Sequence, residues 1–341
     1  MKTKRHQYEL DIFRIFGMLN IVLFHYTFRG YAADNMSVLQ FPYIGGFFKY
    51  GYLWVYAFFI LSGYTTVMSA QNKNITEFLS ARVFRLYPAF WVAVCITTTA
   101  SMFLGNDLYN VKLGQFFVNL TMLNGYVGVK SVDGAYWFIF VILKFYFLVS
   151  LLILCKFIKF NDSIAGIWLI ASFLIVFYDI PKVGFFLIPE YAPFMILGMI
   201  CYSARESGWS VYKLCVSILS SFYSVYIVCK GIPAFNLHYN ADLSLFIVVL
   251  VMLFIILFMM FVTLNKQICR IHPMVKMFGV STYPLYLVHQ NFGYMIFNRY
   301  YYLTNRFIIL CIVLFLVCTI SVIIVKYIDP FITNYLKKVV P

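Results

Sequence analysis

The sequence is poor in charge, and especially in acidic charge. Of its 341 residues 11% are charged and only twelve are Asp or Glu, whereas 63% are hydrophobic. A soluble domain carries about a quarter charged residues, so this chain cannot cover a globular core with a wetted surface. Most of its apolar area must therefore face lipid. The scarcity of carboxylates also disfavours a proton-coupled transporter, which needs charged groups near the middle of the membrane.

Clustered cysteines are also missing. The chain has eight cysteines, none of them in a CxxC pair and most of them within apolar runs. We interpret them as small core residues and expect neither a disulfide framework nor a metal site. The net charge of +14 would suit a nucleic-acid partner, but the Lys and Arg residues are scattered through short segments between apolar runs. That distribution is typical of membrane topology, so we expect no nucleic-acid partner.

Long apolar runs are what the sequence has in abundance. A membrane helix needs about 20 mostly apolar residues, and ten runs qualify. Pro284 within the ninth predicts a kink. With no internal repeat and no linker, the sequence predicts an all-α, polytopic membrane protein that forms a single domain over residues 1–341. The ten predicted spans are 9–28, 50–70, 87–105, 136–158, 163–180, 185–203, 211–229, 242–264, 279–298 and 306–327.

The basic residues between these runs predict an orientation. If the N-terminus lies inside, the inner segments hold sixteen Lys and Arg residues and the outer segments hold eight. Cytoplasmic segments are enriched in positive charge. We therefore expect both termini to be cytoplasmic.

The first predicted helix carries an arginine and a histidine, Arg14 and His25. Eleven helical positions advance about 1100°, which is about 20° beyond three turns, and about 16 Å along the axis. The two side chains therefore share one face at different depths. An intramembrane Arg is costly unless it faces a watery or charged interior. The alternatives are that Arg14 reaches the inner headgroups and that His25 is a packed core residue.

A pair of arginines, Arg82 and Arg85, lies at the predicted cytoplasmic boundary, with Pro88 starting the next span. Residues three apart share a helical face, and such a fork of guanidinium groups suits phosphate. The alternative is a plain positive anchor. The second helix contains Ser62-Gly63, for which close helix packing is the alternative to a functional role.

Two further polar residues fall within predicted spans. Lys144 could pair with Glu190 or Asp133 or contact an acidic sugar, or it could simply extend to the membrane surface. His289, five residues after Pro284, could line a cavity or pack in the core.

These residues form a recognisable order of motifs. The chain has Leu10-Asp11-x-x-Arg14-x10-His25, then Phe58-Phe59-x-x-Ser62-Gly63-Tyr64, then Arg82-x-x-Arg85-x-x-Pro88. Tyr136-Trp137, Phe145-Tyr146, Gly198-Met199 and the stretch from Ser281 to His289 follow. In this order and spacing the chain resembles the acyltransferase-3 family of integral membrane acyltransferases, over roughly residues 8–327.

The resemblance implies ten helices and transfer of an acyl group, expected to be acetyl, from cytoplasmic acyl-CoA to a hydroxyl of an envelope or secreted polysaccharide. It implies that Arg14 and His25 are catalytic and that Arg82 and Arg85 bind the acyl-CoA. We expect Ser62 to contribute to the same acyl-CoA site. We expect Lys144, Trp137 and His289 to bind the carbohydrate acceptor.

The chain departs from the family in two respects. Family members often carry a carboxylate in the fourth helix, where this chain has Lys144, and many carry a fused extracytoplasmic domain, which we do not expect here. Acyl-CoA is then a substrate, with no permanently bound cofactor, and the protein is expected in the plasma membrane of a bacterium. The competing hypothesis is a transporter or flippase of a lipid-linked sugar, without covalent chemistry.

Overall fold

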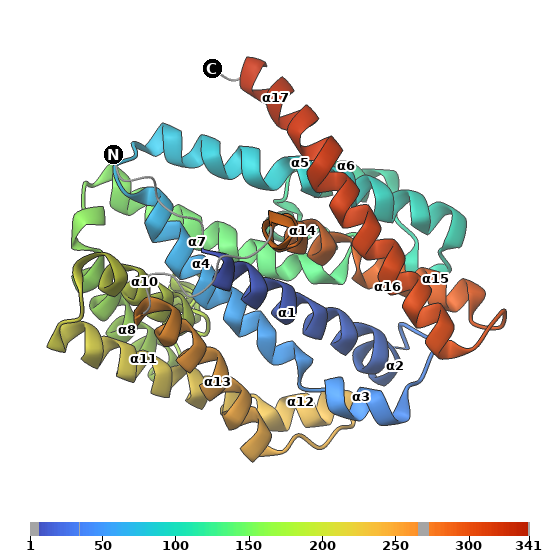
Figure 1. Cartoon of the computed structure of the whole chain (residues 1–341), viewed down its shortest axis with the longest axis horizontal. Coiled ribbons are helices and arrows are strands. Elements are labelled where there is room, and N and C mark those ends of the chain that lie inside the picture. The colour runs from blue at the N-terminus through green and yellow to red at the C-terminus, as the bar shows by residue number, and fades with distance from the viewer. Residues whose placement is uncertain (1–6, 34, 265–272, 340–341) are drawn as a thin grey trace. The chain divides into compact units, whose positions relative to one another are not determined.

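Helices make up the regular structure of the described residues. A computed structural model describes residues 7–33, 35–264 and 273–339, and no strand occurs among them. Figure 1 labels the helices. Their bounds are α1 (Tyr8–Phe24), α2 (Gly30–Ala32), α3 (Pro42–Phe48), α4 (Trp54–Ala70), α5 (Ile75–Leu104), α6 (Leu113–Leu120), α7 (Trp137–Leu154), α8 (Asn161–Phe177), α9 (Pro181–Leu187), α10 (Ala192–Ser207), α11 (Val211–Lys230), α12 (Ile232–Tyr239), α13 (Leu245–Leu264), α14 (Pro273–Val288), α15 (Gln290–Tyr300), α16 (Arg306–Ile323) and α17 (Asp329–Val339).

The helices are long and apolar enough for a membrane. Within the described residues, nine helical stretches meet the length and hydropathy needed to cross one. Only structures that pair their own backbone groups are stable in lipid, which is why apolar runs of this length become helices. The prediction of an all-α, polytopic membrane protein is confirmed. The nine stretches are Tyr8–Ala32, Pro42–Ala70, Ile75–Leu104, Gly134–Leu154, Ile158–Phe177, Pro181–Ser207, Val211–Tyr239, Leu245–Leu264 and Arg306–Lys338.

The predicted ninth span, 279–298, differs from the others. It falls on α14 and α15, which have 16 and 11 residues and meet at a bend at His289. Neither helix alone has the roughly 20 residues that a span needs. Pro284 lies inside α14, so the bend occurs five residues after the proline that was expected to cause it.

Helix α5 begins much earlier than predicted, and Pro88 lies inside it instead of starting it. The apolar run 87–105 covers only the C-terminal part of a 30-residue helix, visible as one long helix in Figure 1. A proline removes the hydrogen bond to the carbonyl four residues before it, here that of Phe84. The hydroxyl of Thr333 in α17 donates to this carbonyl at 3.4 Å, which supplies a replacement.

The chain divides into two compact units, which are described separately. The first unit combines Met1–Tyr52, Ala81–Phe140 and Arg270–Pro341, and the second combines Leu53–Ser80 and Val141–Cys269. Five basic residues used to predict the orientation lie outside the described residues, so the orientation stays a prediction. They are Lys2, Lys4, Arg5, Lys266 and Arg270.

Close packing of α1 on α14 organises the first unit. A Cβ added at Gly279 of α14 would lie 2.6 Å from the Cβ of Asp11. Real Cβ contacts are not this short, so a larger residue at position 279 would displace Asp11. The glycine thus allows α14 to lie directly against the polar start of α1.

Close packing of α4 on α10 organises the second unit. A Cβ at Gly63 would collide with the backbone carbonyl of Met195, and one at Gly198 would collide with that of Ile60. Reciprocal glycines of this kind let two backbones approach each other. The packing interpretation of the Ser62-Gly63 motif therefore accounts for its glycine.

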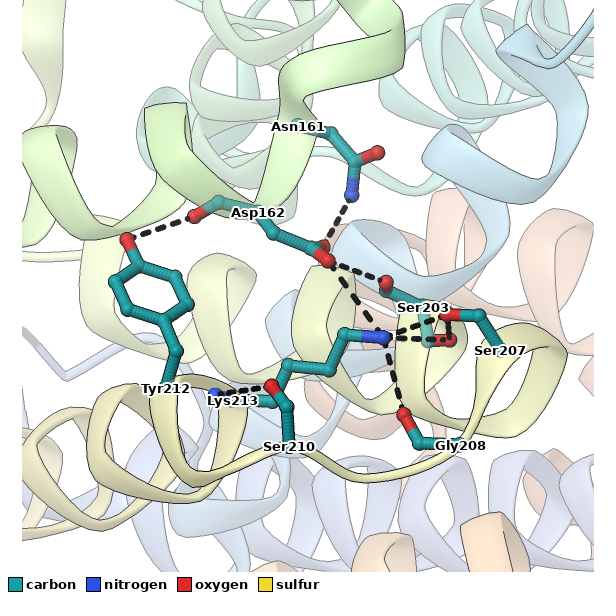
Figure 2. A network of polar contacts seen from close by, with 8 residues as sticks. All are labelled: Asn161, Asp162, Ser203, Ser207, Gly208, Ser210, Tyr212 and Lys213. Atoms are coloured by element: carbon teal, nitrogen blue, oxygen red, sulfur yellow. Dashed lines mark hydrogen bonds and ion pairs between the residues drawn. The ribbon is translucent and has the colours of Figure 1, made fainter.

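An ion pair between buried Lys213 and half-buried Asp162 joins three helix ends in the second unit (Figure 2). Lys213, in the first turn of α11, donates from Nζ to Ser207 Oγ at 2.6 Å and to the carbonyls of Ser203 and Gly208 at 3.3 and 3.0 Å. The same Nζ lies 3.6 Å from Asp162 Oδ2, in the first turn of α8. A cation at the C-terminal end of α10 and an anion at the N-terminal end of α8 both complement the helix dipoles.

Candidate active site

The helix geometry changes at His25. Helix α1 is regular up to Phe24 and is followed by a π-helical turn, η1, over His25–Arg29. Because the α-helix is uninterrupted between Arg14 and Phe24, the shared face of Arg14 and His25 is retained. Single π turns inside helices are rare and occur frequently at functional sites.

The turn brings His25 against a second histidine, His289, which is 264 residues away in sequence. His25 Nδ1 lies 3.3 Å from His289 Nε2, and the ring centroids are 4.8 Å apart with the planes at 75°. His25 Nδ1 also lies 2.8 Å from the carbonyl oxygen of Ile21, and His289 Nδ1 lies 2.8 Å from that of Tyr286. His25 is half-buried, whereas His289 is fully buried.

Two tyrosines hold the backbones of the two histidines together. The Tyr26 hydroxyl donates to the carbonyl of His289 at 2.6 Å, and the Tyr294 hydroxyl donates to the carbonyl of His25 at 3.0 Å. Both tyrosines are fully buried. A Cβ at Gly293 would collide with the Tyr26 ring, so the glycine makes room for it. These reciprocal bonds fix the two rings relative to each other.

A buried carboxylate, Asp133, fixes the loop beside His289. Asp133 accepts hydrogen bonds from the backbone N–H groups of Ala135 and Asn291, each at 2.8 Å. The Asn291 side chain donates to the carbonyl of Val132 at 2.9 Å, and the Tyr286 hydroxyl donates to that of Ala135. Burial raises the pKa of the Asp133 carboxyl to about 6, although both backbone donors favour its charged form.

Arg14 is paired with an acidic residue of its own helix. Its Nη1 lies 2.8 Å from Asp11 Oδ1, and the Asp11 side chain is 1% exposed. The guanidinium of Arg85 is close enough to act electrostatically on Arg14. Arg14 and Arg85 thus bring two guanidinium groups, the donors that bind phosphate, to this end of the first unit.

The two predicted donor-binding arginines differ in environment. Arg82 is 6% exposed, whereas Arg85 is exposed, so they do not form the evenly accessible fork that their spacing suggested. A helix rotates by about 300° over three residues. The 60° that remain are enough to turn Arg82 toward the packed side of α5 and Arg85 toward open space.

The other predicted site residues belong to other helices. Trp137 is 42% exposed in the first turn of α7, four residues after Asp133. Lys144 and Ser62 belong to the second unit. Among the described residues Lys144 makes no ion pair with Glu190; instead its Nζ lies 3.5 Å from the centre of the Phe185 ring, a cation–π contact.

The sequence did not identify three residues that shape this site, Tyr26, Tyr294 and Asn291, and it suggested Asp133 only as a possible partner of Lys144. One signal was available for Tyr26, which directly follows His25 in an apolar helix. Asp133 stands in a loop directly before a predicted span, where a carboxylate suggests a cap and nothing more. Tyr294 and Asn291 are recognisable only once α15 is seen against η1.

The arrangement is suited to proton transfer. A neutral imidazole whose Nδ1–H is held by a carbonyl presents a free electron pair at Nε2, which is the requirement for a general base. Within the described residues, no group of three or more His, Cys, Asp or Glu side chains could hold a metal ion.

Comparison with known proteins identifies the family. The family model of the acyltransferase domain, acyltransferase-3, matches residues 7–326, which is nearly the whole chain and includes both units. Comparison with curated proteins and with solved structures gave no significant match. The chain is therefore a membrane acyltransferase that belongs to the acyltransferase-3 family.

Proposed function

We propose that this acyltransferase transfers an acyl group, with acetyl as the expected one, from acyl-CoA to a hydroxyl of a cell-envelope or secreted carbohydrate. The observation that carries the proposal is the position of His25. Its Nδ1 faces the carbonyl of Ile21 at 2.8 Å, and a carbonyl can only accept, so Nδ1 carries the proton and Nε2 carries the free electron pair. His25 is also half-buried, so a substrate can approach it.

The proposed reaction is a direct transfer. His25 Nε2 takes the proton of the acceptor hydroxyl while the oxygen attacks the carbonyl carbon of the thioester. The carbon–sulfur bond then breaks, and the thiolate of CoA receives the proton from His25. The products are the O-acyl ester and free CoA, and His25 returns to its neutral form. A sugar hydroxyl is a poor nucleophile, which is why a base is needed.

The donor's phosphate groups are proposed to bind at the end of the first unit where Arg14 and Arg85 lie. Arg85 is exposed and acts electrostatically on Arg14, which pairs with Asp11. Guanidinium groups bind phosphate oxygens with two parallel hydrogen bonds. From Arg14 to His25 an α-helix rises about 16 Å, a distance that a pantetheine arm can cover.

The experiment is mass spectrometry of envelope polysaccharide from cells with and without the gene. The proposal predicts that the glycan of expressing cells carries additional acyl groups, removable by mild base as expected for esters. Equal acyl content in the two samples would contradict it. An unmodified glycan that reaches the surface only in expressing cells would instead support a flippase in the plasma membrane.

A further inference from the structure

The roles of the two imidazole rings can be separated by their hydrogen bonds. His289 Nδ1 faces the carbonyl of Tyr286 at 2.8 Å and so carries the proton of that ring, which leaves an electron pair on Nε2. That Nε2 lies 3.3 Å from His25 Nδ1, which carries a proton. His289 is therefore an acceptor toward His25, and the Nδ1–H of His25 is shared between His289 and the carbonyl of Ile21.

Burial excludes His289 from the substrate. The His289 side chain is 0% exposed, and both of its ring nitrogens are occupied by contacts within the protein. The buried position of His289 therefore favours a role other than the predicted binding of the acceptor. A buried acceptor behind a base has a different function, because it determines which nitrogen of the base is free.

The surroundings keep His289 in this position. Tyr26 holds its carbonyl at 2.6 Å, and the adjacent Asn291 is tied to Asp133 and to Val132. The bend between α14 and α15 occurs at His289 itself. Three separate attachments thus converge on one short segment, which is the arrangement expected for a residue whose ring must not turn.

We infer that His289 is a positioning residue for His25. Resting on the proposed function, the inference is that His289 Nε2 accepts the Nδ1–H of His25, keeps the electron pair of His25 on Nε2, and stabilises the imidazolium formed when His25 has taken the hydroxyl proton. The ring of His289 acts through His25 and does not touch either substrate. The same logic applies to the acidic member of a hydrolase triad, with a neutral ring in place of a carboxylate.

The test compares His289→Leu with His289→Gln. Leucine removes the acceptor, whereas the side-chain oxygen of glutamine can accept the same proton. Membranes from expressing cells are incubated with [14C]acetyl-CoA, and label incorporated into envelope material gives kcat and KM. We expect His289→Leu to lower kcat by about 10- to 100-fold, a part of the 10²–10⁴ that a general base supplies. KM for acetyl-CoA should stay within about twofold, since His289 does not touch the donor.

Glutamine should recover kcat to within about fivefold of the wild type, because it restores the hydrogen bond. His238→Leu, the same substitution at an exposed histidine of α12, is the control and should leave the rate unchanged. A merely structural role would give equal losses for leucine and glutamine and would overturn the inference. In a His25→Ala background, His289→Leu should have no further effect on the residual rate.

Failure of this inference can be told from failure of the proposed function. If wild-type membranes transfer no label, the transferase proposal fails. If the wild type transfers label and His289→Leu transfers it at an undiminished rate, only the role of His289 is wrong.

Discussion

The Lys213 network of the second unit and the histidine pair of the first unit differ in how completely their polar groups are paired. In the second unit, Lys213 has three hydrogen-bond acceptors and a carboxylate around its ammonium group (Figure 2). Its partner Asp162 accepts from Asn161 and Ser203, each at 2.8 Å. Every charge has a partner within the protein, which is what a structural network requires.

In the histidine pair of the first unit, the ring nitrogens are less completely paired. Among the described residues, three of the four ring nitrogens face a carbonyl or the other ring, and the fourth, His25 Nε2, is the proposed reacting nitrogen. The comparison shows why burial of polar groups does not by itself identify a site. A completed network stabilises the fold, whereas a rigid network with one group left over can do chemistry.

The largest effect is expected at His25. His25→Ala should lower the rate of acyl transfer by about 10²–10⁴-fold, because it removes the proposed base. The measurement is release of the CoA thiol from acetyl-CoA by membranes that contain equal amounts of each variant. Gel-filtration elution in detergent should match that of the wild type. A loss smaller than about threefold would contradict the role of His25.

The next effect concerns the donor. Arg85→Ala should weaken CoA binding by about 10- to 150-fold, since a lost charge-assisted contact is worth about 1.5–3 kcal/mol. Arg85→Lys should recover only part of this, because lysine keeps the charge without the fork. The measurement is the Kd for CoA of purified protein, with Lys326→Ala, another exposed basic residue of the first unit, as control. An unchanged affinity for CoA would support the alternative that Arg85 is only a positively charged membrane anchor.

A third prediction concerns the Lys213 network. Lys213→Met should destabilise the protein by about 1–3 kcal/mol, less than for a fully buried pair because the Asp162 side chain is 30% exposed. The midpoint of thermal unfolding in detergent should fall, while activity per folded molecule is retained. Lys182→Met, at an exposed position, should leave the midpoint unchanged. An unchanged midpoint in Lys213→Met would mean that the network does not stabilise the fold.

The smallest effect is the pH dependence introduced by Asp133. Its pKa is raised from 3.8 to about 6 in the folded protein, so folding takes up a proton between these values. Its contribution to stability is present below pH 3.8 and is lost as the pH rises through 6, by about 3 kcal/mol in all and about 1 kcal/mol between pH 5 and pH 7. Asp133→Asn should reduce the change of the thermal unfolding midpoint with pH between pH 5 and pH 7. An equal slope in both proteins would contradict the shift.

Much of the fold was predictable, because lipid imposes a simple rule on sequence. Long apolar runs become helices, and most residues of each of the ten predicted spans are helical, although the sixth span is interrupted at 188–191 and the ninth at His289. Helical extensions beyond the lipid follow no such rule. The apolar pattern therefore predicts the start of this span at Pro88, whereas α5 begins thirteen residues earlier, at Ile75.

The site was predictable only along single helices. Arg14 and His25 share a face by helical spacing, but the approach of His289 to His25 depends on how α1 and α14 pack. That packing depends on Gly279, and the fit of α15 against η1 depends on Gly293, roles that are visible only from what a Cβ there would meet. The spacing of Arg82 and Arg85 predicts the same role for both, because it does not reveal that Arg82 is buried by its neighbours while Arg85 is exposed.

The most direct test measures both clusters in one experiment. Transfer of label from [14C]acetyl-CoA to envelope material and the thermal unfolding midpoint are determined for the wild type, His25→Ala and Lys213→Met. We expect His25→Ala to keep the unfolding midpoint of the wild type and to transfer label at least about 10²-fold more slowly. Lys213→Met should lower the thermal unfolding midpoint and leave the rate of transfer per folded molecule unchanged. Full transfer by His25→Ala, or no transfer by the wild type, would contradict the central claim that the histidine pair of the first unit performs acyl transfer.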